Sequence, residues 1–157
     1  MWCRMRTVIQ RVKQARVTVD GLEIGTIGQG IVALLGVHTH DGPDQAAWTA
    51  TKIAGLRIFA DDSGKMNLDV REAGGSVLAI SQFTLLGSCE KGRRPSFVAA
   101  ASPEHAEPLY ERVILELKAL GIPVATGRFR ADMLVELTND GPVTLILDSP
   151  PTSTHTN

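Results

Sequence analysis

Apolar and polar positions along the chain alternate in patterns that mostly predict strands. Residues 7–12 and 15–19 are rich in β-branched side chains and partly alternate, which predicts strands with one wet face. Asp20-Gly21 predicts a tight turn, after which residues 22–24 return as the second strand of a hairpin. Residues 31–37 contain no polar side chain and predict a central strand covered on both faces.

Two stretches have the apolar spacing of helices instead. Asp44 is expected to cap a first helix, whose apolar positions lie between residues 47 and 54. A second helix is expected to begin after Ser102 and to end at Gly121. Pro108 fits this helix badly, so the pattern predicts either a kink or a helix that starts at Pro108.

Residues 76–85 predict a long buried strand that becomes polar at its far end. Ser81 and Thr84 lie in that polar part and are conceivable nucleophiles, but a hydroxyl needs a base to attack at neutral pH. The sequence places no evident base beside either residue. The alternative is that both hydroxyls satisfy neighbouring backbone groups.

Near the C-terminus, residues 138–144 separate the apolar runs 133–137 and 143–147. Gly141 lacks a Cβ and Pro142 has a fixed φ, so the pattern predicts a sharp turn between two strands. An ordinary hairpin turn accounts for the spacing. A cis bond before Pro142 would free carbonyl groups that can converge on an amine, and the sequence leaves the cis or trans state open.

The charge balance requires local clusters for any anionic partner. The 157 residues suit one domain, and 16 Lys and Arg face 17 Asp and Glu. Lys91, Arg93 and Arg94 form a basic cluster beside Phe97, which is either a solvated loop or a mixture of cations and ring suited to a phosphate and a base. No apolar run approaches the roughly 20 residues of a membrane span, and no signal peptide is recognisable, so we expect a cytoplasmic protein.

Several common chemistries lack their signatures. No Gly-x-Ser-x-Gly elbow, His-Glu-x-x-His pair, phosphate-binding Walker loop or Gly-x-Gly-x-x-Gly follows a strand. Cys3 and Cys89 are expected to be free thiols. His38 and His40 could chelate a metal, but a solvated strand end is the favoured interpretation. We expect no metal and no cofactor, in a mixed α/β fold with a largely antiparallel, barrel-like sheet and a few helices.

A series of short motifs occurs in a fixed order from about Met5 to Leu147. They are Met5 to Val12, Arg57 to Phe59, Gly64 to Asn67, Gly74 to Val77, Ser81-Gln82-Phe83-Thr84-Leu85, Lys91 to Phe97, Thr126 to Phe129 and Asn139 to Thr144. Together they resemble the D-aminoacyl-tRNA deacylases, once called D-tyrosyl-tRNA deacylases. The resemblance implies one deacylase domain over residues 5–148 with the fold of that family, preceded by an extension, 1–4. Residues 149–157 are polar and contain proline, so we expect them to form a disordered tail.

The resemblance also implies a function and its residues. A homodimer would hydrolyse the ester of D-aminoacyl-tRNA, and of glycine mischarged on tRNA, with help from the 2′-hydroxyl of the terminal adenosine. The catalytic residues would be Ser81, Gln82, Phe83 and Thr84. Gly141 and Pro142 of the partner subunit would capture the substrate amino group and reject L-amino acids. The tRNA and its adenosine would be bound by Lys91, Arg93, Arg94 and Phe97.

Two alternatives remain open. One is a related deacylase with a trans Gly-Pro turn that removes L-alanine from a non-cognate tRNA. Phe83 and the pair Val143-Thr144 look instead like the D-specific branch. The other is a nucleic-acid-binding module without catalysis, which the basic cluster alone would permit. A DNA partner is not expected.

Overall fold

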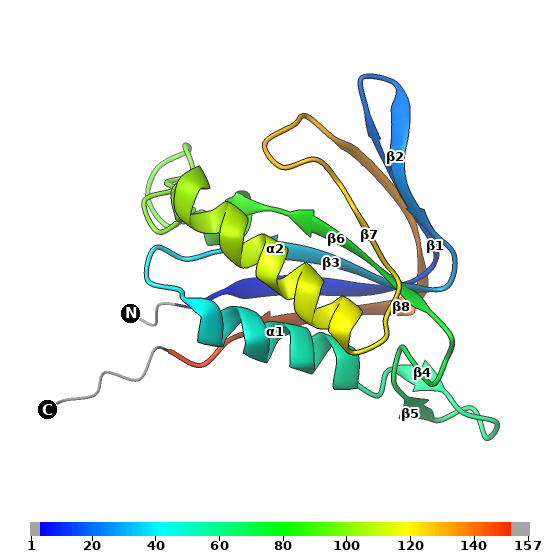
Figure 1. Cartoon of the computed structure of the whole chain (residues 1–157). Helices are drawn as coiled ribbons and strands as arrows, with labels where there is room; N and C mark the ends of the chain where they lie inside the picture. Colours follow the sequence, from blue (N-terminus) through cyan, green and yellow to red (C-terminus); the bar gives the residue numbers. More distant parts are fainter. Residues whose placement is uncertain (1–3, 152–157) are drawn as a thin grey trace, which may run out of the picture.

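The structure is a computed structural model, and it describes residues 4–151 (Figure 1). Cys3 and residues 152–157 of the expected tail lie outside the described residues. The strands are β1 (Arg6–Val19), β2 (Leu22–Ile27), β3 (Gly30–Gly36), β4 (Phe59–Ala60), β5 (Met66–Leu68), β6 (Ser76–Ser81), β7 (Val124–Thr126) and β8 (Leu134–Asp148). The helices are α1 (Pro43–Gly55), the 3-10 helix η1 (Phe83–Leu86) and α2 (Pro103–Ala119).

Strand β1 organises the main sheet. Its first half pairs with β3 and its second half with β2, while β8 runs antiparallel along almost its whole length. The order is β2-β1-β3-β6-β7, with β8 on β1, and only the β3/β6 and β6/β7 pairs are parallel. Because β1 changes partner along its length, the sheet curves strongly (Figure 1). The prediction of a mixed, largely antiparallel and barrel-like sheet is confirmed.

Both faces of the central strands are buried. Helices α1 and α2 lie side by side across one face (Figure 1), where Ile53 of α1 and Val113 of α2 are fully buried. Val32 faces the other side of the sheet and packs with Leu78 inside its curve. The hydroxyl of Tyr110 ties α2 to β6 by donating to the Ala79 carbonyl over 2.8 Å, and burial raises its pKa to about 12. The expectation that residues 31–37 form a central strand is confirmed.

The helices differ from their predicted starts. Gly42 rather than Asp44 is the N-cap of α1, and Gln45 Oε1 accepts the Gly42 N–H at 2.8 Å. Helix α2 begins at Pro103, after Ser102, and continues through Pro108. Of the two alternatives for Pro108, the helix that starts at this residue is therefore wrong. None of the described helices has the length and apolar character needed to cross a membrane.

Two further predictions, one of a strand and one of a turn, are also wrong. The strand predicted over 76–85 ends at Ser81, because its neighbour β3 ends at Gly36 and offers no further ladder. The turn predicted over 138–144 lies inside the continuous strand β8. Asn139 pairs with Val12 and Thr144 with Gln10, so the four residues 140–143 bulge out opposite Arg11.

The ordered domain continues just past its expected end at residue 148. Ser149 is fully buried, and its Oγ accepts the Met5 N–H at 3.1 Å. The Ser149 N–H donates to the Met5 carbonyl over 3.0 Å. Ser149 is thus fixed against the start of the domain, although the predicted disordered tail, 149–157, included this residue.

Candidate active site

A cavity of about 540 Å³ lies at the end of β6. It is lined by Val37, Ser81, Gln82, Phe83, Thr84, Phe97, Ala100, Ala101, Pro103, Ala106, Phe129, Arg130, Ala131, Asp132 and Met133. Five residues predicted from the sequence, namely 81–84 and Phe97, therefore meet at one place. Lys91, Arg93 and Arg94 do not line it.

The polar wall forms because the chain leaves the sheet after Ser81. The Gln82 N–H still donates to the Leu35 carbonyl over 2.7 Å, and the next residues turn into η1. At the start of a helix the first N–H groups have no carbonyl before them to bind. Within the described part of the chain, the N–H groups of Phe83 and Thr84 have no hydrogen-bond partner. Two adjacent free donors on a cavity wall suit a developing oxyanion.

The hydroxyl groups on this wall lack an activating base. Gln82 Nε2 lies 2.7 Å from Thr84 Oγ1 and donates to it. Asp132 is the one carboxylate that lines the cavity, and no described hydrogen bond joins it to Ser81 or Thr84. The geometry therefore favours Thr84 as a positioned hydrogen-bonding group over an activated nucleophile.

A second part of the lining, called the aromatic wall, contains Phe97 and Phe129 among mostly apolar residues. The rings of Phe83 and Phe97 meet edge to face with centroids 5.3 Å apart. Gly87 makes room for Phe97, since a Cβ there would lie 2.8 Å from Phe97 Cε1. The segment from Phe129 to Met133 completes this wall. In the sequence, only the Thr126 to Phe129 motif pointed to Phe129.

The Gly141-Pro142 bulge lies elsewhere in the same protomer. Both residues are exposed, neither lines the cavity, and the peptide bond between them is cis. Arg11 holds the bulge by donating from Nε to the Asp140 carbonyl over 2.9 Å, and from Nη1 to the Ile58 carbonyl over 2.6 Å. Asn139 Oδ1 accepts the Val143 N–H at 2.8 Å. Arg11 lies in the Met5 to Val12 motif, but no role was predicted for it from the sequence.

The basic cluster lies on an exposed loop that leads into Phe97. Reciprocal backbone hydrogen bonds of 2.8 and 2.9 Å between Ser88 and Ser96 close the loop at its base. The side chains of Lys91, Arg93 and Arg94 form no ion pair or hydrogen bond within residues 4–151. Cys89 in the same loop is an exposed free thiol, as expected.

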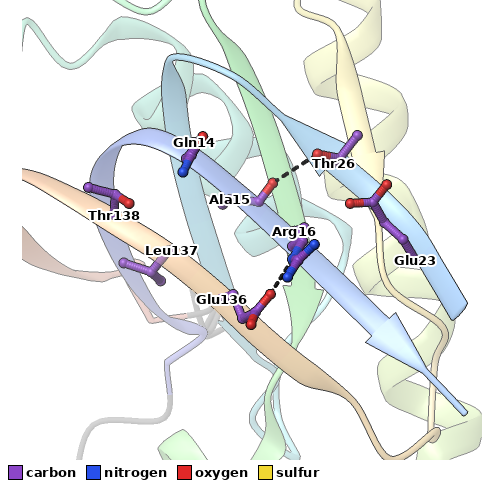
Figure 2. A pocket seen from close by; sticks show the side chains of 8 residues that line it. All are labelled: Gln14, Ala15, Arg16, Glu23, Thr26, Glu136, Leu137 and Thr138. Carbon is purple, nitrogen blue, oxygen red and sulfur yellow. Dashed lines mark hydrogen bonds and ion pairs between the residues drawn. The ribbon is translucent and has the colours of Figure 1, made fainter. Parts of the chain in front are cut away.

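A second cavity, of about 510 Å³, lies between β1, β2 and β8 (Figure 2). Figure 2 shows Arg16 and Glu136 pointing toward one another from neighbouring strands, where they form an ion pair. Its other polar side chains are Gln14, Glu23, Thr26 and Thr138. No residue predicted from the sequence lies here, and no hydroxyl meets a base. We assign this cavity no catalytic role.

The histidines at the exit of β3 form a local structural cluster. The His38 and His40 rings stack with centroids 5.4 Å apart, and His38 Nδ1 accepts the His40 N–H at 3.1 Å. Burial lowers the pKa of His38 and raises the pKa of the neighbouring Asp41 carboxyl to about 6. The described residues contain no group of three or more His, Cys, Asp or Glu placed to hold a metal ion.

Comparison with known proteins decides the family. A family model described as D-Tyr-tRNA(Tyr) deacylase matches residues 8–148. The chain belongs to this family. A D-aminoacyl-tRNA deacylase of Geobacter sulfurreducens is 59% identical over 152 residues, covering 97% of this chain and 100% of the relative. One of Halalkalibacterium halodurans is 56% identical over 145 residues, covering 92% and 99%.

Solved structures give the same fold for this deacylase-family chain. A protein described as c-Myc DNA unwinding element binding protein is 40% identical, with a TM-score of 0.88 over 93% of this chain and 99% of that one. A probable eukaryotic D-amino acid tRNA deacylase is 16% identical, with a TM-score of 0.80 over 92% and 99%. The second likeness concerns the fold alone.

Proposed function

We propose that the protein hydrolyses the ester bond of D-aminoacyl-tRNA, and of glycine mischarged on tRNA, and releases the free amino acid and the tRNA. The observation that carries this proposal is the cavity that Ser81 to Thr84, with two free backbone donors, line together with Phe97 and Phe129. Membership of the deacylase family supports it. Because the substrate is a charged tRNA, we place the reaction in the cytoplasm.

The aromatic residues of the cavity and the residues of η1 have different roles in the proposed reaction. The aromatic side, with Phe97 and Phe129, stacks the terminal adenine. The ester then lies along η1, where the N–H groups of Phe83 and Thr84 stabilise the oxyanion. No protein base acts, and the 2′-hydroxyl of the terminal ribose assists the hydrolysis. The protein supplies orientation and hydrogen bonds, which lower the barrier without a covalent intermediate.

A second copy of the chain provides the selection of D-amino acids over L-amino acids. The Gly141-Pro142 bulge of the partner enters the cavity, where carbonyl oxygens accept the substrate ammonium and the rigid backbone excludes an L side chain. In the described chain β8 pairs only with β1 and is an edge strand. It exposes Leu134, Val135, Leu145 and Ile146 at 73%, 37%, 38% and 65%. An apolar edge strand next to this bulge suits a two-fold dimer interface.

The exposed loop carrying Lys91, Arg93 and Arg94 contributes to tRNA binding. Its three cations have no protein partner among the described residues, so they can neutralise phosphates beside the cavity. Such binding weakens with added salt. One structural relative is described as binding DNA, and an unlabelled single-stranded DNA is therefore a useful competitor in the assay.

Incubation with matched D-Tyr-tRNA, L-Tyr-tRNA and Gly-tRNA tests the proposal. We expect cleavage of the D-ester and of the glycyl ester, with the L-ester left intact. Preferential cleavage of L-Ala-tRNA would support the related L-alanine deacylase. Cleavage of no ester, with tRNA binding retained, would support a binding module. Thr84→Ala is expected to reduce hydrolysis by about tenfold; complete loss with intact tRNA binding would instead identify Thr84 as the nucleophile.

A further inference from the structure

Two charged side chains stand at the cavity that the proposed reaction uses. Among the residues that line it, only Arg130 and Asp132 carry charge, and both are exposed. Both precede β8 and lie in the segment that forms the aromatic wall. Neither forms an ion pair or a hydrogen bond through its side chain within residues 4–151. Arg130 is thus the one cation among the lining residues, and Asp132 is the one carboxylate.

The backbone of Arg130 is unusual. Its φ of +65° lies in the left-handed region, which side chains of L-amino acids disfavour. The other described non-glycine residue in that region is Asp20, whose short polar side chain suits the tight turn before Gly21. No such reason accounts for Arg130. Its side chain is long, and a glycine would adopt the same backbone conformation more easily. A strained position at a site edge is a reason to look for a role of the side chain.

The proposed substrate supplies a partner for this cation. When the adenine stacks on the aromatic wall and the ester lies along η1, the 5′ phosphate of the terminal nucleotide must leave through the open side of the cavity. Guanidinium binds phosphate oxygens in a bidentate manner, whereas a carboxylate repels them. Of the charged lining groups, Arg130 therefore attracts the phosphate and Asp132 disfavours it.

We propose that Arg130 binds the phosphodiester that joins the terminal adenosine to the preceding nucleotide, and so positions the acceptor end in the cavity. This inference rests on the proposed function. Arg130 acts as a specificity residue for a polynucleotide ester over a simple nucleoside ester. The basic loop with Lys91 serves the more distant phosphates.

The test compares two substrates, D-Tyr-tRNA and 3′-O-D-tyrosyl-adenosine, which lacks phosphate. Arg130→Gly removes the charge and suits the backbone. For this variant we expect kcat/KM for D-Tyr-tRNA to fall about tenfold through KM, with the nucleoside ester unchanged. The salt dependence of KM for the tRNA should flatten by roughly 0.7 in log–log slope. Arg128→Ala, an exposed arginine outside the cavity lining, is the matched control and should leave both substrates unchanged.

Asp132→Asn removes the negative charge and leaves Arg130 in place, so we expect the opposite effect on KM. It should lower KM for D-Tyr-tRNA and leave the nucleoside ester unaffected, and it keeps the test valid if Arg130→Gly folds poorly. Equal losses on both substrates, or no loss on either, would overturn the role of Arg130. If the wild-type protein cleaves neither D-ester, the proposed function fails first, and that result is distinct from a failure of Arg130 alone.

Discussion

Gly141 has a backbone that a residue with a side chain enters only with strain. Its φ is +136°, and a Cβ built there would lie 2.8 Å from Val143 Cγ2 and 3.0 Å from Arg11 Nη2. The guanidinium of Arg11 is held by two backbone carbonyls, so it cannot move away freely. Glycine is therefore required to keep the bulge in its present shape.

Gly141→Ala is expected to disturb the bulge and to reduce kcat/KM for D-Tyr-tRNA by about a hundredfold, with a stability loss of about 1–3 kcal/mol. Steady-state kinetics and urea denaturation measure the two effects. Gly28→Ala is a suitable control, because no atom lies within 4 Å of its added Cβ. Activity of Gly141→Ala equal to that of Gly28→Ala would contradict the role of the bulge.

Asp41 combines burial with incomplete hydrogen bonding. Its Oδ2 accepts the His38 N–H at 2.6 Å, whereas Oδ1 is buried with no partner in the described structure. Desolvation raises the pKa of the carboxyl from 3.8 to about 6, against the opposing pull of the His38 and Met5 backbone N–H groups and of His105 and His40. Between these two pKa values the folded state binds the proton more tightly than the unfolded state. The stability contributed by Asp41 therefore falls as pH rises from about 4 to about 6.

Asp41→Asn removes this ionisation. We expect the variant to gain stability relative to the wild type at pH 8, and to lose that gain near pH 4.5, where the native carboxyl is protonated. Urea midpoints of both proteins at the two pH values measure the difference. His38, whose pKa is lowered, destabilises the fold on acidification in both proteins and largely cancels. The same difference at both pH values would show that ionisation of Asp41 is irrelevant.

At the scale of elements, η1 is positioned by direct contact with the end of β3. A Cβ on Gly36 would lie 2.5 Å from Leu86 Cδ2 and 3.0 Å from the Gln82 carbonyl oxygen. Backbone atoms cannot yield as a flexible side chain can. The absence of a side chain at Gly36 therefore fixes where the polar wall of the cavity stands.

Gly36→Ala is expected to push η1 outward, costing about 1–3 kcal/mol of stability and lowering kcat/KM at least tenfold. Thermal unfolding and hydrolysis of D-Tyr-tRNA are the measurements. Gly55→Ala, at the end of α1 with open space around its added Cβ, provides the control. An active Gly36→Ala protein with unchanged stability would mean that this contact does not set the wall.

Local patterns predicted those elements whose cause is local. The β1–β2 hairpin, the buried strand β3 and both long helices follow from turn residues and apolar periodicity. The predictions were wrong where pairing with a strand that is distant in the sequence determines the local structure. β6 ends where β3 ends, and the bulge at 140–143 exists because β1 pairs on both sides of it. The local sequence of β6, or of residues 140–143, does not show which strand will pair with it.

At the scale of the whole molecule, the site joins segments that the sequence keeps far apart. The family motifs marked Ser81 to Thr84 and Phe97, and the structure brings these residues into one cavity. No role was predicted for Arg11, although it lies in the Met5 to Val12 motif, or for Arg130, since the role of each arginine depends on what folds against it. The contribution of Gly141 and Pro142 from a second protomer stays a prediction, because it depends on how two molecular surfaces meet and not on the local sequence.

The position of the bulge argues for a shared site. Met133 lines the cavity just before β8, and Pro142 follows nine residues later, roughly 30 Å along an extended strand. That length is an upper limit because β8 is irregular and the sheet is curved, and neither Gly141 nor Pro142 lines the cavity of its own protomer. In a two-fold dimer the same bulge can reach the cavity of the other copy.

Subunit mixing distinguishes these arrangements. Thr84→Trp fills the cavity and Gly141→Ala disturbs the bulge, so each homodimer should be nearly inactive. After random exchange about half of the dimers are mixed, and each mixed dimer joins one intact cavity to one intact bulge. Activity should thus recover to about a quarter of the wild-type value. If each bulge served its own protomer, every chain would carry one defect and mixing would restore nothing, so the absence of recovery in a verified mixed dimer would refute the shared site.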